Sequence, residues 1–219
     1  MIELNKIIHA DCMDIMKDIP DSSIDLVLTD PPYGIKRDKG FEGFEGFGGF
    51  GKPIKRTEYK GNWDSEKISK KYFNEILRIG KAVIIFGGNF YTDILPQSNH
   101  WIVWDKKNTM PTFGDCELAW TNIKRNSVKL YEVEFNGLLG REKERIHATQ
   151  KPLKLFKRII NDYSKEGDII LDCFSGSGTT AVACIDLNRN YICIEKDKDY
   201  YEASLKRIDK ENIKLKLAI

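Results

Sequence analysis

Short runs of apolar residues recur along the chain and predict a series of strands. The run from Ile24 to Thr29 is rich in Ile, Leu and Val and does not alternate with polar residues, which is typical of a parallel strand buried on both faces. Residues 128–135 do alternate, so they are expected to form a half-exposed antiparallel strand. Further strands are predicted for residues 6–10, 82–86, 101–104, 118–121, 168–171 and 191–195.

Between several of these strands the apolar residues follow helical spacing instead. Helices are predicted for residues 13–17, 65–79, 153–163 and 179–187 and for the stretch after residue 200. Alternating strands and helices imply right-handed crossovers and an α/β fold with a doubly wound sheet. Ligands bind beyond the carboxyl ends of the strands in such sheets. The residues at these ends are Asp11, Asp30, Phe174 and Glu195.

The composition fits one globular domain and restricts the classes of partner. The chain has 219 residues, of which 41% are hydrophobic and 31% charged, so a single α/β domain over 1–219 with a substantial core is expected. The formal net charge of +2 is too small to identify a polyanionic partner by itself. A nucleic-acid surface would therefore have to be a local patch.

Cysteine and histidine usage gives no indication of a metal site. The five cysteines include no CxxC pair and the three histidines are far apart in the sequence, so no metal is expected. An odd number of cysteines and an N-terminus without an apolar signal segment favour a cytoplasmic protein. The longest apolar run, at 82–86, is too short to cross a bilayer, and no membrane partner is expected.

A glycine-rich loop at residues 172–180 links a predicted strand to a predicted helix. Its glycines allow a tight turn and a close approach of the backbone to a ligand, and Glu195, at the end of the next strand, could accept both hydroxyl protons of a ribose. Residues 176–181 also satisfy the GxGxxA pattern, so an NAD-dependent oxidoreductase is one alternative. Too few residues follow Thr180 for a second mononucleotide-binding half, so the cofactor half must pack on strands that come earlier.

A second segment, Asp30-Pro31-Pro32-Tyr33, follows a buried strand and suits chemistry on an amino group. The exocyclic nitrogen of adenine is a poor nucleophile because its lone pair is delocalised into the ring. The Asp30 carboxylate and the Pro31 carbonyl could accept its two N–H hydrogens, and the stiff prolines would hold both acceptors in place. Tyr33 could stack on a base removed from the duplex. A proline turn with a capping aspartate is the structural alternative.

With these two segments in this order, the chain resembles the permuted beta group of DNA N6-adenine and N4-cytosine methyltransferases. In that group Asp-Pro-Pro-Tyr precedes the cofactor motif FxGxG. The resemblance covers nearly the whole chain and implies a Rossmann-like, mostly parallel seven-stranded sheet with one antiparallel strand. It also implies S-adenosylmethionine as the cofactor, with Asp11 at its adenine and Glu195 at its ribose.

The same resemblance implies a set of cofactor-binding residues, to which the segment 147–152 contributes. This segment departs from the family at Ala148, where the family usually has proline. The residues expected to bind the cofactor are Asp11, Cys12, His147, Thr149, Lys151, Asp172, Phe174, Ser175, Gly176, Gly178, Thr179, Glu195 and Lys196.

The resemblance divides the domain into a catalytic half at 1–121, a target-recognition insert at 122–147 and a cofactor-binding half at 148–219. Residues 36–62 are rich in glycine and phenylalanine and are expected to form a mobile loop that closes over DNA. A solvated surface is the alternative for this loop and for the insert. The basic residues expected to contact double-stranded DNA are Lys36, Arg37, Lys124 and Arg125.

The sequence therefore predicts a site-specific DNA methyltransferase of a bacterium, archaeon or phage, with restriction–modification as one context. Adenine N6 is the expected target because Asp in the first position of the catalytic segment mostly accompanies adenine in this family. Cytosine N4 is the nearest alternative, and a non-catalytic DNA-binding subunit is another. The insert is short, which suggests a short recognition sequence or help from a second subunit in a homodimer.

Overall fold

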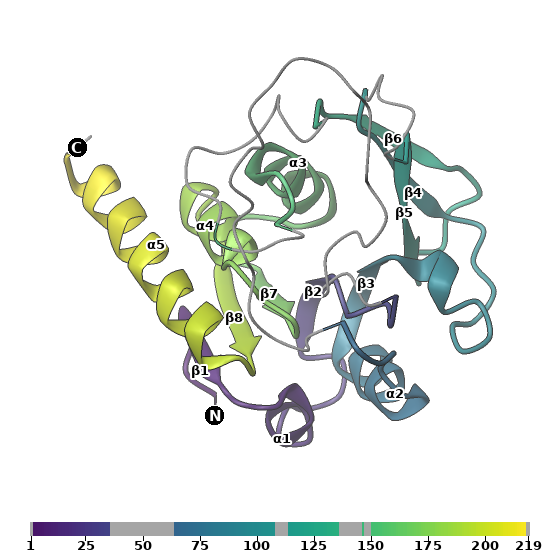
Figure 1. Cartoon of the computed structure of the whole chain (residues 1–219), viewed down its shortest axis with the longest axis horizontal. Helices are drawn as coiled ribbons and strands as arrows, with labels where there is room; N and C mark the ends of the chain where they lie inside the picture. Colours follow the sequence, from purple (N-terminus) through teal and green to yellow (C-terminus); the bar gives the residue numbers. More distant parts are fainter. Residues whose placement is uncertain (1, 36–63, 108–113, 136–145, 147–149, 218–219) are drawn as a thin grey trace, which may run out of the picture.

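The computed structural model describes residues 2–35, 64–107, 114–135, 146 and 150–217 (Figure 1). Eight strands form one sheet within these residues, and each run that was predicted as a strand is one of them. The strands are β1 (Lys6–His9), β2 (Ile24–Thr29), β3 (Gly80–Phe86), β4 (Trp101–Asp105), β5 (Cys116–Thr121), β6 (Lys129–Glu132), β7 (Ile169–Asp172) and β8 (Asn190–Glu195).

The order of the described strands in the sheet is β1-β8-β7-β2-β3-β5-β4-β6. β5 runs antiparallel to both of its neighbours, β3 and β4, whereas the other neighbouring pairs are parallel. The expected mostly parallel sheet with one antiparallel strand is confirmed, but the sheet has eight strands instead of the expected seven. The antiparallel direction predicted for residues 128–135 is wrong as well, because β6 pairs in parallel with β4.

The exposure of β6 explains why its sequence suggested the wrong direction. β6 is the last described strand of the sheet, and it buries Tyr131 while Lys129, Leu130 and Glu132 are exposed. Alternation of polar and apolar residues reports that one face of a strand is buried. A parallel and an antiparallel strand at the edge of a sheet can produce the same alternation.

Helices cover both faces of the sheet, as predicted for a doubly wound fold (Figure 1). The core on one face is formed with α1 and α2, and the core on the other face with α3 and α4. Leu26 and Leu28 of β2 belong to the core under α3 and α4, whereas Val27 belongs to the opposite core. The helices are α1 (Cys12–Met16), α2 (Lys70–Ile79), the 3₁₀ helix η2 (Gly88–Phe90), α3 (Leu153–Tyr163), α4 (Thr179–Asp186) and α5 (Lys198–Leu217).

The beginning of α2 differs from the prediction, which placed the helix over 65–79. α2 begins only at Lys70, because residues before it contact Tyr33 and Gly34 instead of continuing the helix. Lys67 pairs with Tyr33 in an isolated β-bridge, so this part of the chain is extended. None of the helices in the described part of the chain is long and apolar enough to cross a membrane.

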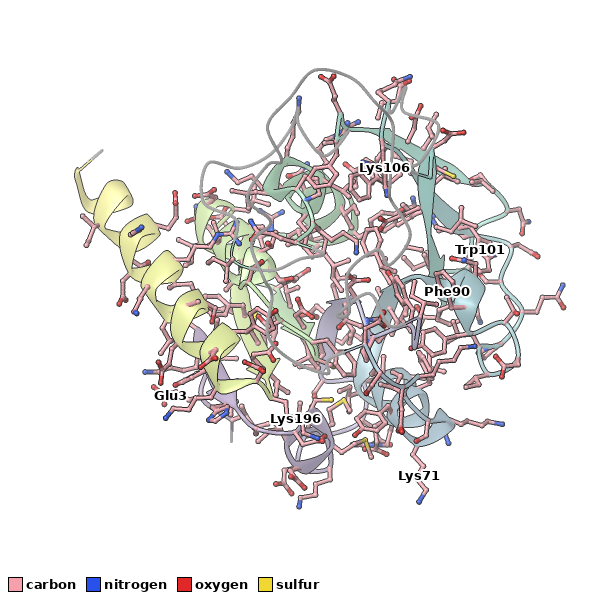
Figure 2. The ribbon with its side chains drawn as sticks, viewed as in Figure 1. Glu3, Lys71, Phe90, Trp101, Lys106 and Lys196 are labelled. Atoms are coloured by element: carbon pink, nitrogen blue, oxygen red, sulfur yellow. The ribbon has the colours of Figure 1, made fainter. Side chains whose placement is uncertain are left out.

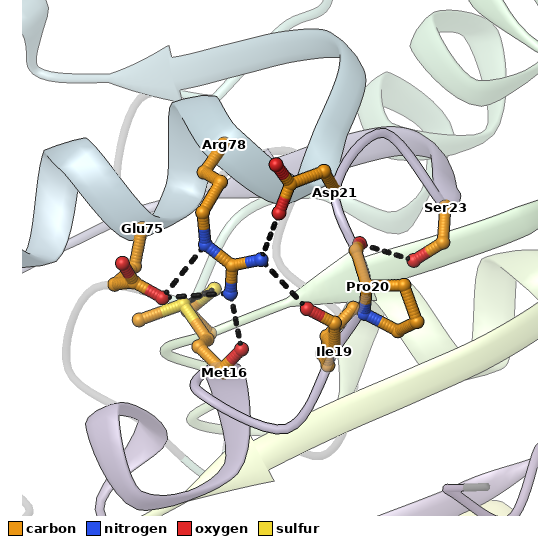
Figure 3. A network of polar contacts seen from close by, with 8 residues as sticks. Met16, Ile19, Pro20, Asp21, Ser23, Glu75 and Arg78 are labelled. Atoms are coloured by element: carbon orange, nitrogen blue, oxygen red, sulfur yellow. Dashed lines mark hydrogen bonds and ion pairs between the residues drawn. The ribbon is translucent and has the colours of Figure 1, made fainter.

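The connection that follows α1 is held in place by Arg78 of α2 (Figure 3). The Arg78 guanidinium donates hydrogen bonds to the backbone carbonyls of Met16 and Ile19, both at 2.9 Å. It also pairs with the carboxylates of Asp21 and Glu75. Residues 16–21 are thereby tied to the last turn of α2, at the edge of the sheet where β2 and β3 begin.

Candidate active site

A cavity of about 460 Å³ lies at the carboxyl ends of β1, β8, β7 and β2. These four strands are neighbours and run parallel, so the segments that follow them meet at one edge of the sheet. Residues 30–33 and residues 172–177 of the glycine loop both line the cavity. Two stretches that are far apart in the sequence therefore converge, as the sequence hypothesis required.

Asp30 follows β2 and presents its carboxylate to the cavity. One oxygen, Oδ1, accepts a hydrogen bond from the Tyr33 hydroxyl, and the other, Oδ2, accepts one from the Lys151 ammonium. The Asp30 side chain is 17% exposed. Its burial raises the pKa of the carboxyl group above the usual value, although the positive charge of Lys151 acts in the opposite direction.

Contacts from two other segments hold the backbone of residues 32–34. The Asp64 carboxylate accepts hydrogen bonds from the backbone N–H groups of Tyr33, at 2.7 Å, and Gly34, at 2.9 Å. The Tyr91 hydroxyl donates a hydrogen bond to the Pro32 carbonyl. Because Asp64 is almost fully buried, its two bonds are shielded from water and restrain the turn that follows Pro32.

The ring of Tyr33 is confined between its neighbours. It stacks on Phe90 with a distance of 4.7 Å between ring centroids and an angle of 18° between ring planes. Gly87 has a φ of +67°, and a Cβ at this position would overlap the Tyr33 ring. One face of the ring is therefore covered, and stacking on a base would have to use the other face.

Asp172, the last residue of β7, organises the glycine loop from inside the protein. Its Oδ1 accepts hydrogen bonds from the Thr29 hydroxyl at 2.8 Å and from the Phe174 N–H at 3.2 Å, while Oδ2 accepts one from the Thr180 hydroxyl at 2.5 Å. Burial raises the pKa of Asp172 to about 6. The side chain lines the cavity, but both of its oxygens already have protein partners.

Glu195 stands at the end of β8 and supports the same loop. Its Oε2 accepts a hydrogen bond from the Gly176 N–H at 2.7 Å, and its Oε1 accepts one from the Asp197 N–H at 2.8 Å. Each carboxylate oxygen can accept a second bond, so the group can still bind the hydroxyls of a ribose. Burial raises the pKa of Glu195 above its usual value.

Asp11 occupies the position between β1 and α1. Its carboxylate accepts the Met13 N–H at 3.0 Å, which caps the helix, and it pairs with Lys196 at 3.0 Å and with the Tyr72 hydroxyl at 3.3 Å. Lys196 lies beside the start of α1 in Figure 2. Burial acts to raise the pKa of Asp11, but the Met13 N–H and the Lys196 charge outweigh it, so the pKa lies below the usual value.

Most of the residues predicted for the site come together at the cavity. Gly178 does not line it, because its Cα faces α5, where an added Cβ would lie 3.1 Å from the Cβ of Ser204. Burial raises the pKa of Cys12 to about 12, so this side chain offers a neutral thiol to the cavity. The predicted residues that line the cavity are Asp11, Cys12, Asp30, Pro31, Pro32, Tyr33, Lys151, Asp172, Phe174, Ser175, Gly176, Thr179, Glu195 and Lys196.

The remaining predicted residues lie elsewhere. Lys124 and Arg125 are exposed on the connection between β5 and β6, and the Arg125 guanidinium lies 5.5 Å from the centroid of the Tyr163 ring. Neither residue lines the cavity, so their DNA contacts stay a prediction. Four further residues predicted for the site lie outside the described residues, namely Lys36, Arg37, His147 and Thr149.

Sequence reasoning missed several residues of the site. Tyr72 lies in the predicted helix at 65–79 and had no predicted role, but its hydroxyl reaches Asp11 and its ring lies 6.2 Å from that of Phe174. Its hydroxyl on an otherwise apolar helix face is the feature that could have identified it. Asp64 and Gln150 also line the cavity. Among the described residues there is no group of three or more His, Cys, Asp or Glu that could hold a metal ion.

Comparison with known sequences gives one family. The sequence profile of a family described as DNA methylase, the N6/N4 methyltransferases, matches residues 96–206. The chain is 30% identical to the type II methyltransferase M.HinfI of Haemophilus influenzae, over 94% of this chain and 68% of that protein. It is 29% identical to the type II methyltransferase M2.MboI of Moraxella bovis, over 92% of this chain and 86% of that protein.

Comparison with solved structures also finds DNA methyltransferases. The crystal structure of M1.HpyAVI in complex with SAM is similar with a TM-score of 0.59 and 25% identity, over 93% of this chain and 98% of that one. The cytosine-N4-specific PvuII DNA methyltransferase is similar with a TM-score of 0.61 over 92% of this chain and 85% of that one. At 16% identity, this second likeness concerns the fold alone.

Proposed function

Because this chain belongs to the family of N6-adenine and N4-cytosine DNA methyltransferases, we propose that it methylates N6 of adenine in double-stranded DNA. The resemblance found in the sequence is confirmed, as are the activity of a DNA methyltransferase and S-adenosylmethionine as its cofactor. Membership of this family removes the alternative of an NAD-dependent oxidoreductase. The proposal concerns the choice of base and the residues that act on it.

The observation that carries the proposal is that Asp30 and the glycine loop line the same cavity. A base held at residues 30–33 and a methyl donor held at the loop would face each other there, as direct displacement at a nitrogen requires. Each oxygen of the Asp30 carboxylate has a second lone pair. It can therefore accept a hydrogen from an amino group in addition to the bonds from Tyr33 and Lys151.

The proposal assigns the target to adenine because the acceptor at position 30 is a carboxylate. In this family, Asp at this position mostly accompanies adenine N6, whereas Ser accompanies cytosine N4. An ionised carboxylate is also a stronger hydrogen-bond acceptor than a serine hydroxyl. In the proposed reaction the Asp30 carboxylate and the Pro31 carbonyl accept the two hydrogens of the adenine N6 group. The nitrogen lone pair then becomes available for attack, and Asp30 takes up the proton that leaves.

The side chains at the cavity fit S-adenosylmethionine. Glu195 places a buried carboxylate next to the Gly176 amide, which suits a ribose diol. Tyr72 and Phe174 offer aromatic surface for a purine, and Asp11 offers an acceptor beside them. Bound S-adenosylmethionine supplies an electrophilic methyl group on its sulfonium sulfur. The protein binds this group, orients it toward Asp30 and excludes water from the cavity.

The test is to incubate the protein with S-adenosylmethionine that carries a tritiated methyl group and with genomic DNA from cells that lack DNA methylation. The DNA is then digested to nucleosides and separated by chromatography. We expect the label in N6-methyl-2′-deoxyadenosine, and none for the variant Asp30→Ala. Folded wild type and variant are compared by circular dichroism and by binding of S-adenosylhomocysteine.

Three other outcomes would contradict the proposal. Label in N4-methylcytosine would assign the enzyme to the cytosine class. Binding of S-adenosylhomocysteine without any transfer of label would favour a non-catalytic subunit. Full activity of Asp30→Ala would show that the carboxylate does not act on the amino group.

A further inference from the structure

We propose that Glu117 is a positioning residue for methyl transfer, which acts through Lys151 to hold an ion-paired Asp30 carboxylate toward the target amino group. This inference rests on the role of Asp30 in the proposed function. The sequence had assigned Lys151 to the cofactor and had given no role to Glu117. The structure instead joins both residues to the catalytic carboxylate.

Four side chains form a row of alternating charges that leads away from the cavity. The Lys151 ammonium pairs with Asp30 on one side and with Glu117 Oε2, at 3.3 Å, on the other. Glu117 Oε1 pairs in turn with the Lys106 ammonium at 2.7 Å. The exposed fraction of these side chains is only 6% for Lys151, 20% for Glu117 and 14% for Lys106.

The topology of the sheet brings Glu117 to this place. β5 is antiparallel to β3 and β4, so its first residues lie at the edge where the parallel strands end. Glu117 stands at the second position of β5, opposite Trp104, and Lys106 follows directly after β4. Figure 2 shows Lys106 beside β4. A charged residue at the start of the one antiparallel strand of the described sheet can therefore reach the catalytic edge.

Burial makes each charge in the row depend on its neighbours. A carboxylate or an ammonium that leaves water without a partner tends to become neutral. Burial acts to raise the pKa of Glu117, but Lys151 and Lys106 outweigh it and hold the pKa at about 2. Glu117 is therefore charged at neutral pH. Burial acts to lower the pKa of Lys151, but Asp30 and Glu117 raise it above the usual value.

Glu117 thus has two effects on the reaction. It keeps Lys151 protonated, and it gives the ammonium a second anchor, so that Lys151 stays beside Asp30 Oδ2 while Oδ1 is held by Tyr33. It also keeps the row of four side chains without net charge beside a cavity that receives a cationic sulfonium. Without Glu117, the ammonium groups of Lys151 and Lys106 would exceed the Asp30 carboxylate by one positive charge.

The variant Glu117→Gln removes the charge and keeps the shape. We expect kcat to fall about tenfold, because Lys151 loses an anchor, with little change in KM for DNA. The pH profile of kcat should also move to lower pH. Glu117 raises the pKa of both Lys151 and Asp30, so its loss lowers both, and each limb of the profile follows. The other groups at Asp30, namely Tyr33 and Asp172, are unchanged.

The variant Lys151→Met should shift the acid limb of the pH profile of kcat in the opposite direction. Lys151 lowers the pKa of Asp30, so its loss should move the acid limb of the profile to higher pH. In the double variant, the Glu117→Gln change should have no further effect on kcat, because Glu117 acts through Lys151. Glu117→Asp should recover part of the activity, and the surface variant Glu3→Gln, which loses a pair with Lys6, should behave as wild type.

Thermal melting and binding of S-adenosylhomocysteine show which variants are folded. If Glu117→Gln does not fold, Lys106→Met, which removes only the outer charge, provides the test and should lower kcat by a smaller factor. If the wild type is active but Glu117→Gln leaves the pH profile of kcat unshifted, this inference is wrong and the proposed function stands. The same conclusion follows if the losses of kcat in the two single variants multiply in the double variant. A folded wild type that transfers no methyl group would overturn it together with the proposed function.

Discussion

The hydroxyl of Thr29 donates a hydrogen bond of 2.8 Å to the carboxylate of Asp172, which joins the end of β2 to the end of β7. Thr29 directly precedes Asp30, and Asp172 begins the glycine loop. The two residues are fully or almost fully buried, and this bond is shielded from water. It therefore helps to set the distance between the Asp30 carboxylate and the glycine loop, to which the proposed function assigns the target base and the cofactor.

The first prediction is that Thr29→Val lowers both stability and turnover. Valine keeps the shape of threonine but removes the hydroxyl donor, so that Asp172 Oδ1 keeps only the 3.2 Å hydrogen bond from the Phe174 N–H among the described residues. Loss of one bond to a buried carboxylate should reduce the free energy of unfolding by about 1–3 kcal/mol. Urea unfolding and kcat measure the two effects. Thr29→Ser, which keeps the hydroxyl, should retain both, and an equal loss in this variant would contradict the explanation.

The raised pKa of Asp172 predicts a dependence of stability on pH. The folded pKa of about 6 lies above the usual value of 3.8, so the folded state binds the proton more tightly than the unfolded state. The resulting stabilisation is fully present below about pH 4 and is lost as the pH rises through about 6. Its size is on the order of 3 kcal/mol.

The variant Asp172→Asn isolates this effect, because the other carboxyl groups contribute equally to both proteins. The difference between the unfolding free energies of wild type and variant should fall by up to this amount from pH 4 to pH 7. Urea titrations at a series of pH values measure it. A constant difference over this range would mean that the pKa of Asp172 is not raised by its burial.

The parts of the site that the sequence identified are those whose chemistry is local. Asp30-Pro31-Pro32-Tyr33 and the glycine loop each carry their function in consecutive residues, and each follows a run that is unmistakably a strand. Their convergence could also be inferred, because both strands had to end at the same edge of a parallel sheet. The assignment of Glu195 and Asp11 to that edge follows from the same rule.

The parts that the sequence did not identify depend on neighbours from distant segments. Glu117 stands near the catalytic edge only because β5 runs antiparallel between β3 and β4, and strand order is not visible in local periodicity. Tyr72 turns toward Asp11 because α2 packs beside α1. Residues 65–69 fit a helical pattern, but the bridge between Lys67 and Tyr33 interrupts it, and the helix begins at Lys70.

Gly87 is expected to tolerate no side chain, because its backbone and its surroundings both exclude one. Gly87→Ala would strain a φ of +67° and would push a methyl group into the Tyr33 ring. Gly167→Ala is a matched control, since φ is +85° there but nothing lies within 4 Å of the added Cβ. Strain alone should cost about 1–2 kcal/mol of unfolding free energy in the control.

The comparison of these two glycine variants separates strain from displacement of Tyr33. Gly87→Ala should lose more stability than Gly167→Ala, and kcat should fall at least about tenfold because Tyr33 holds Asp30 Oδ1. Gly167→Ala should keep the wild-type kcat. Urea unfolding and steady-state kinetics provide both measurements, and equal kcat values for the two variants would show that Tyr33 can move without consequence.

Lys124 provides a test of the target-recognition insert, because it is exposed on the connection between β5 and β6. If this side chain neutralises a phosphate, Lys124→Ala should weaken DNA binding and reduce the slope of log Kd against log salt concentration by about 0.9. Binding of S-adenosylhomocysteine should not change, since Lys124 does not line the cavity. Fluorescence anisotropy with a labelled duplex at several salt concentrations measures the slope.

Lys17→Ala supplies the control for this measurement, because Lys17 is an exposed lysine that follows α1, on the other face of the sheet from α3. It removes the same charge from the protein and should leave the slope unchanged. Arg125→Ala should also reduce the slope, but with some loss of stability, since its guanidinium lies over the Tyr163 ring. If Lys124→Ala and Lys17→Ala change the slope equally, the effect is one of net charge, and the insert does not hold the DNA backbone at this position.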